Sequence, residues 1–338
     1  MAKIEKILIV TLCALLLAFS AAGCDKAVKK DKDVKEFKKG PDGLVMSFVP
    51  NYPPDKFIVA NTDEPISILV EVRNKGTYPP QGNNQEDSDA RTNFGTGAIH
   101  LSGFDTSIIQ IDPLSQSISG IDLPSASSVN PGGIDTAEFD GNIVANNILI
   151  DNYNPTILVT ACYPYQTKAT SSICIDPKPF DTREKKVCTI GSQNVPNQGA
   201  PIAVTRIDQE VAGGKIQFKI SVKNVGKGEV IWSRDGSVLN RCDPNQGRLE
   251  RRDFDRVQLE KFSIGNVDLF AEGKCAPFAD GTDDVVKLFN GEGFVICTYD
   301  IPSGIQSAYT TVIDVELGYA YRSTISKPIQ IRKIETVG

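Results

Sequence analysis

The chain has 338 residues, enough for two domains of ordinary size, and its 40% hydrophobic and 23% charged residues are typical of a globular protein. Its formal net charge is −6, although its first 40 residues are rich in lysine, so the remainder is more acidic still. An acidic surface repels phosphate, which argues against a nucleic-acid partner.

Residues 1–24 have the pattern of a secretory signal. Two lysines precede an apolar run at residues 7–19, and small residues then lead to Cys24. The run is shorter than the roughly 20 apolar residues of a membrane span, and the order basic, apolar, small is that of a signal peptide. The stretch Ala21-Ala22-Gly23-Cys24 resembles the lipobox of bacterial lipoproteins. This resemblance implies cleavage before Cys24 and a lipid on that cysteine; an uncleaved signal anchor is the alternative.

Residues 25–43 predict a charged tether. Up to Gly40 they are mostly lysine and aspartate, with no apolar face wide enough to pack. Fully extended, such a segment spans on the order of 50 Å. Its lysines can also lie against anionic headgroups, each contributing roughly 1 kcal/mol. We therefore expect a membrane-anchored protein on the extracytoplasmic side, at the cell surface or on the periplasmic side.

The rest of the chain repeats itself. Residues 66–76 and 216–226 both alternate apolar with other residues and then close with Asn-x-Gly. Alternation at period two predicts a strand with one buried face, and Asn and Gly supply the turn. Three further stretches match in the same order: Leu101 and Phe104 with Leu259 and Phe262, residues 138–140 with 298–300, and residues 159–175 with 315–331.

These copies predict an all-β fold of two tandem immunoglobulin-like β-sandwiches, at residues 44–177 and 200–333, with a linker at 178–199. Short strands alternate with turn residues, and no convincing amphipathic helix is present. The second domain carries a long insertion, residues 233–290, with a basic and acidic run at 248–256. Insertions on a rigid scaffold often carry function. The alternative is a long loop without a function of its own, held in place by its cysteines.

The alternating strand, its Val-x-Asn-x-Gly ending and a later acidic-aromatic strand resemble the cell-adhesion-related immunoglobulin-like domains of bacterial and archaeal surface proteins. The resemblance covers residues 66–76 and 216–226 well and the rest of the chain loosely. It implies a surface module and names no ligand, since fold does not determine function.

Cysteine use predicts disulfides. Apart from Cys13 in the apolar run and Cys24, an even number remains, as expected of an exported protein. Cys162 and Cys174 flank what the pattern predicts to be a final hairpin turning near Lys168, so we expect these two to pair; a Cys162–Cys188 bridge is the rival. The full set of candidates is Cys162, Cys174, Cys188, Cys242, Cys275 and Cys297. With no Cys-x-x-Cys spacing, a metal site is not expected.

No pattern identifies catalytic residues. His100 is the only histidine, and alternation along its strand predicts that it faces solvent. Acidic loops offer weak calcium candidates without the spacing of a helix–loop–helix site, and solvated loop acids are the commoner case. Those candidates are Asp280, Asp283 and Asp284, and a similar loop holds Glu86, Asp87 and Asp89. No other cofactor is expected.

We therefore expect a membrane-tethered extracytoplasmic surface protein that acts as a structural or adhesive module, with a protein or glycan partner, and not an enzyme. The alternative is a cell-envelope polymer hydrolase that uses a carboxylate pair.

Overall fold

The computed structural model describes residues 40–79, 94–118, 123–127, 130–181, 185–212, 214–279 and 281–334. Within them the regular structure is almost entirely β-strand, interrupted by one short α-helix and short 3-10 turns, so the all-β class is confirmed. In this part of the chain no helix is both long and apolar enough to cross a membrane. The expected signal peptide, Cys24 and most of the predicted tether lie outside the described residues.

Strands of the first repeat form a four-stranded antiparallel sheet. Its order is β1 (Leu44–Phe48), β3 (Glu64–Asn74), β7 (Ile134–Ile143) and β5 (Ile109–Ile111). Along β3 every second side chain is buried, as the alternating sequence predicts. The strand therefore has one core face and one outer face.

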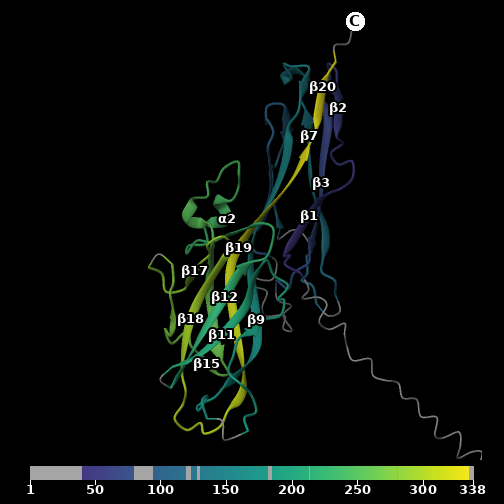
Figure 1. The fold of residues 1–338 in the computed structure, drawn as a ribbon. Helices are drawn as coiled ribbons and strands as arrows, with labels where there is room; N and C mark the ends of the chain where they lie inside the picture. The colour runs from purple at the N-terminus through teal and green to yellow at the C-terminus, as the bar shows by residue number, and fades with distance from the viewer. Residues whose placement is uncertain are drawn as a thin grey trace, which may run out of the picture. The chain divides into compact units, whose positions relative to one another are not determined.

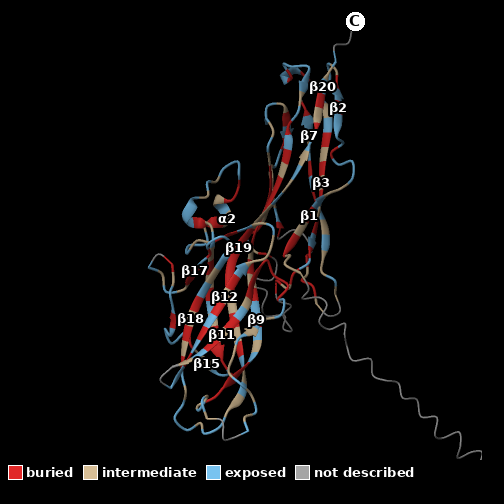
Figure 2. Ribbon diagram, in the orientation of Figure 1, coloured by how far each residue is buried: buried red, intermediate tan, exposed pale blue. Residues whose placement is uncertain are grey.

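Strands of the second repeat, together with one strand from the predicted linker, form the matching five-stranded sheet. Its order is β10 (Gln193–Asn194), β11 (Ile202–Ala212), β12 (Lys215–Asn224), β18 (Glu292–Asp300) and β16 (Cys275–Ala276). The pairing of β12 with β18 repeats that of β3 with β7. Buried and exposed positions alternate along these strands as well, as Figure 2 shows.

An eight-stranded sheet contains strands of both repeats. Its main path runs β15 (Val267–Asp268), β14 (Arg256–Ile264), β19 (Tyr309–Pro328), β9 (Thr156–Ile175), β4 (Ala98–Ser102) and β6 (Ser115–Ser117). Two short strands lie off this path: β13 (Glu229–Ile231) pairs with β19, and β17 (Val285–Lys287) pairs with β14. The central strands β9 and β19 pair residue for residue over their whole length.

A small three-stranded sheet holds the end of the chain. Here β20 (Gln330–Lys333) lies between β2 (Lys56–Val59) and β8 (Asn152–Tyr153), parallel to β2 and antiparallel to β8. The last strand of the second repeat thus completes a sheet whose other two strands belong to the first.

The two repeats exchange their last strands. The first half of β9 pairs with β4, a strand of its own repeat. The second half of β9 pairs with the part of β19 that in turn pairs with β14, a strand of the second repeat. In Figure 1 the yellow β19 passes from the group with β11, β12 and β18 to the group with β1, β3 and β7. Pro164 lies opposite Ala320, its own counterpart in the repeat, so the two strands are related by an approximate twofold axis at this pair.

The predicted hairpin near Lys168 is wrong. The chain continues as one strand from Thr156 to Ile175, and Lys168 lies in the ladder opposite Glu316. Residues Phe37–Gly338 group as a single unit by their contacts. Separate folding of residues 44–177 and 200–333 stays a prediction, and each of these stretches donates its last strand to the other.

A cluster of buried tyrosines lies where β9 and β19 pass from one repeat to the other. Tyr163 lies opposite Tyr321 and Tyr165 opposite Tyr319, and the four rings contact one another in edge-to-face, tilted or stacked pairs. Each hydroxyl has a partner: the Tyr165 hydroxyl donates to the carbonyl of Gly199 at 2.7 Å, and the Tyr321 hydroxyl accepts from the amide of Gly228 at 2.7 Å. Burial raises the pKa of all four phenols, so they stay neutral hydrogen-bonding groups.

The Asn-x-Gly turns of the two repeats have the same geometry. The Asn74 side chain donates to the carbonyl of Tyr78 and accepts from the amide of Gly76. The Asn224 side chain likewise donates to the carbonyl of Gly228 and accepts from the amide of Gly226. The motif therefore fixes one turn in each repeat, beside the tyrosine cluster.

Candidate functional site

The segment between β13 and β14, residues 232–255, lies over the centre of the shared sheet; we call it the cap segment. It contains the helix α2 (Val238–Arg241) and the 3-10 turn η4 (Arg251–Asp253). Its ends meet, because the amide of Trp232 donates to the carbonyl of Asp253 at 2.8 Å. A small core lies beneath it, made of Cys162, Ile231, Val238, Cys242 and Ala320, with Leu239, Leu249 and Phe254 packed around them.

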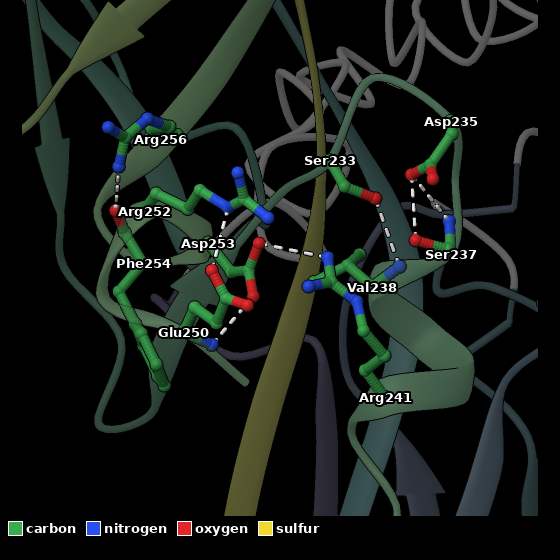
Figure 3. Close-up of polar contacts among 10 residues, drawn as sticks. All are labelled: Ser233, Asp235, Ser237, Val238, Arg241, Glu250, Arg252, Asp253, Phe254 and Arg256. Atoms are coloured by element: carbon green, nitrogen blue, oxygen red, sulfur yellow. Dashed lines mark hydrogen bonds and ion pairs between the residues drawn. The ribbon is translucent and has the colours of Figure 1, made fainter. Parts of the chain in front are cut away.

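A buried ion pair organises the cap segment (Figure 3). The guanidinium of Arg241 donates to Asp253 Oδ1 at 2.9 Å, and the amide of Glu250 donates to the other oxygen, Oδ2, at 2.7 Å. Because the Asp253 side chain is only 4% exposed, both of its oxygens depend on these donors. The pair therefore ties the α2 half of the segment to the η4 half.

A second polar group holds the start of α2. The amide of Val238 donates to the Ser233 hydroxyl, and the Asp235 carboxylate accepts from the hydroxyl and the amide of Ser237 (Figure 3). The hydrogen bonds that Asp235 accepts, led by that of the Ser237 hydroxyl, lower its pKa to about 2. Asp235 therefore accepts these hydrogen bonds as an ionised carboxylate at neutral pH.

Three contacts join the cap segment to the first repeat. Cys242 forms a disulfide with Cys162 of β9. The Asn245 side chain donates to the carbonyl of Leu101 on β4 at 2.8 Å. The Asp243 carboxylate lies 3.8 Å from Nδ1 of His100. The cap segment therefore bridges both repeats where their strands cross.

His100 is buried, so the prediction that it faces solvent is wrong. Alternation along β4 does send it away from the main core, but the cap segment covers that face and leaves His100 only 4% exposed. Its Nδ1 lies 2.8 Å from the Ser115 hydroxyl, and among the described residues its Nε2 has no hydrogen-bond partner. Burial, the largest effect, lowers the pKa of His100 against the opposing pull of Asp243.

The arrangement of Ser115, His100 and Asp243 differs from a catalytic triad. A triad needs the serine on one imidazole nitrogen and the acid on the other. Here the hydroxyl and the carboxylate both approach Nδ1. This geometry provides a polar contact between β4, β6 and the cap segment.

All six candidate cysteines form disulfides, but the expected Cys162–Cys174 pair is wrong. Cys162 pairs with Cys242, Cys174 with Cys188, and Cys275 with Cys297. Because β9 does not turn, Cys162 and Cys174 lie twelve residues apart along one strand, a separation of about 40 Å. The rival Cys162–Cys188 bridge is absent as well.

Of the calcium candidates, the structure describes only Asp283 and Asp284. Asp280 lies outside the described residues, as do Glu86, Asp87 and Asp89, and Asp283 is exposed. Asp284 instead accepts hydrogen bonds from Arg234 and from Gln258, each at 3.0 Å. Among the described residues, no cluster of three or more histidine, cysteine or acidic side chains has metal-binding geometry.

Only part of the predicted insertion, residues 233–290, is an excursion. The strand β14 within it pairs with β19, and its Leu259 and Phe262 are fully buried. The cap segment is the part that leaves the sheet. Its role could not be predicted from sequence, since Cys242 gives no sign of its partner 80 residues away.

No family model matches this sequence, and no curated protein matches it either.

Proposed function

We propose that this chain is a membrane-tethered extracytoplasmic surface protein that acts as a rigid structural or adhesive module. The observation that carries this proposal is the pairing of β9 with β19 over their full length, because it makes one continuous ladder through both repeats. A hinge between the repeats would have to break that ladder. Such a scaffold suits the presentation of a binding face at a fixed orientation.

Each half of the molecule is proposed to be an immunoglobulin-like β-sandwich completed by a strand of the other. In the first half, the sheet with β3 and β7 would pack on β4, the start of β9 and the end of β19. Buried residues of these strands belong to one hydrophobic cluster, which supports this layering.

Export and anchoring are proposed on chemical grounds. Three disulfides are typical of oxidising compartments outside the cytoplasm. The signal-like residues 1–24, with Cys24 at their end, supply a route to such a compartment and a site for lipid.

Fractionation of cells that express the full chain tests the anchor. We expect the wild-type protein in the membrane fraction and accessible to added protease from the extracytoplasmic side. Cys24→Ser should release the protein or leave an uncut precursor, and Cys13→Ser, a matched change in the apolar run, should behave as wild type. A Cys24→Ser protein that stays membrane-bound at its mature size would refute lipidation.

The alternative function, an envelope-polymer hydrolase, has its own test. Purified protein incubated with isolated cell-envelope polymer should release no reducing ends above the buffer control if the chain is a structural or adhesive module. Steady release that scales with protein concentration would favour the hydrolase.

A further inference from the structure

The outer face of the sheet with β11, β12 and β18 differs in character from the rest of the molecule. These strands lie side by side in Figure 1. Their inner face is core, with Phe218 of β12 and Val295 of β18 fully buried. The alternate positions point outward and place Lys215, Lys219 and Lys223 in a row along β12. Beside them on β18 is Phe294, a residue that is 43% exposed.

Two adjoining hollows lie on this face. The first, of about 580 Å³, is lined by Lys215, Lys274, Ile296 and Asp300 among others. The second, of about 490 Å³, is lined by Arg206, Lys219, Lys223, Glu292 and Phe294 among others. Phe294 and Ile296 are two residues apart on one strand, so the hollows are neighbours on the same face. Both volumes are in the range of small-molecule sites.

The charge of this face is opposite in sign to that of the chain. Five cations and two carboxylates line the hollows, and Asp208 and Glu210 of β11 face the same side, so this face has a net charge of +1, whereas the whole chain has a net charge of −6. In the first hollow, Lys215 and Lys274 lie 3.0 and 3.2 Å from the single carboxylate of Asp300, and their hydrogen bonds lower its pKa. Two ammonium groups on one carboxylate leave a positive charge for a second anion.

The second hollow combines a cation with an aromatic ring. The Lys219 ammonium lies 4.7 Å from the centre of the Phe294 ring. Arg206, at the same hollow, pairs with Asp208 at 2.6 Å, and Lys223 pairs with Glu292 at 2.6 Å. These pairs are solvent-exposed and therefore weak, so an incoming anion can exchange with them. The hydroxyls of Thr205 and Ser221 line the same hollow.

We propose that this face binds an extended, carboxylate-bearing polysaccharide. One sugar carboxylate would bind between Lys215 and Lys274, a second at Lys219 and Arg206, and a sugar ring would pack on Phe294. Lys215 and Lys219 are four residues apart, about 13 Å along the strand, so the two bound carboxylates would belong to sugars that are not adjacent in the polymer. Nucleic acid carries one charge per roughly 1.7 Å, a much denser spacing than that of the cations on this face. The proposal deepens the adhesive function proposed above and rests on it.

Native gel retardation of the full mature chain in mild detergent tests the proposal. The gels contain sodium alginate, a polyuronate, or neutral dextran, or inorganic polyphosphate as a densely charged polymer. We expect retardation by alginate that weakens with added salt, none by dextran, and less by polyphosphate than by alginate. Equal retardation by dextran, or stronger retardation by polyphosphate, would overturn the assignment of carboxylated sugar.

Matched variants locate the site. Lys219→Glu and Phe294→Ala should each raise the apparent dissociation constant for alginate at least tenfold. Lys178→Glu and Phe180→Ala change an exposed lysine and an exposed phenylalanine elsewhere and should leave it unchanged. Far-ultraviolet circular dichroism confirms that each variant is folded. The proposed polysaccharide site is refuted if the site variants bind alginate as the wild type does, or if the wild-type chain does not bind alginate. The membrane fractionation described above tests the proposed function separately.

Discussion

Gly76 lies directly against the hydroxyl of Tyr165, in a position where a methyl group would overlap that oxygen. Gly226 has the same relationship to Tyr321 in the second repeat. Tyr165 is fully buried and bonded to Gly199, so it cannot move aside freely. Each Asn-x-Gly turn thus needs glycine because a tyrosine from the exchanged strands occupies the space of a side chain.

The variant Gly76→Ala should therefore destabilise the protein by about 1–3 kcal/mol, the usual cost of overpacking a well-packed site. Gly191→Ala is the matched control, because an added Cβ at Gly191 meets nothing within 4 Å. The free energy of unfolding from denaturant titration measures both changes. A Gly76→Ala protein as stable as the control would mean that Tyr165 moves aside for the added methyl group without a loss of stability.

Removing the Cys162–Cys242 bridge should cost more than removing Cys174–Cys188. The first spans 80 residues of chain and the second 14, so the chain-entropy model assigns about 1.5 kcal/mol more to the first. Denaturant titration of the two double Cys→Ser variants gives the comparison. Peptide mapping of the unreduced protein must also join Cys162 to Cys242; a Cys162–Cys174 peptide would contradict the structure.

His100 should make stability depend on pH in a narrow window. Its pKa is lowered in the folded state, from 6.5, so the unfolded chain binds the proton more readily. The contribution of neutral His100 is therefore fully present above about pH 6.5 and declines as pH falls from there to the lowered pKa. As the chain holds no other histidine, His100→Gln should flatten the dependence of the unfolding free energy on pH just below about pH 6.5. An unchanged slope would exclude His100 as its source.

The Arg241–Asp253 pair should matter far more than its exposed neighbour. Asp253→Ala leaves a partly buried guanidinium without its carboxylate, which costs about 3–5 kcal/mol for a buried pair. The pair of Arg252 and Glu250 is mostly solvent-exposed, so Arg252→Ala should cost less than about 1 kcal/mol. Hydrogen exchange of the cap segment amides reports the difference, with faster exchange expected in Asp253→Ala alone. Equal exchange in the two variants would argue against this role.

Expression of residues 40–177 alone tests the strand exchange. In this fragment the place of β19 is empty, and the β9 of a second copy can fill it, because Pro164 marks an approximate twofold axis. With Cys162 and Cys174 changed to serine to prevent mispairing, we expect a β-rich dimer by light scattering. A folded monomer would show that β9 can close on its own repeat.

The sequence alone determined the all-β class, the duplication and the buried face of most strands. Residues 66–76 and 216–226 carry their pattern locally, because every second side chain of a strand faces the core wherever the strand is placed. The Asn-x-Gly turns were equally predictable, since asparagine and glycine favour turns through their own backbone and side-chain chemistry.

Only the tertiary structure decided which strands meet. A period-two pattern shows which face of β9 is buried but not whether the strand turns at Lys168 or continues into the other repeat, since pairing is a contact between distant parts of the chain. The same reason explains the errors at Cys162 and His100. Each faces away from the main core as alternation predicts, and the cap segment, arriving from far along the chain, covers both.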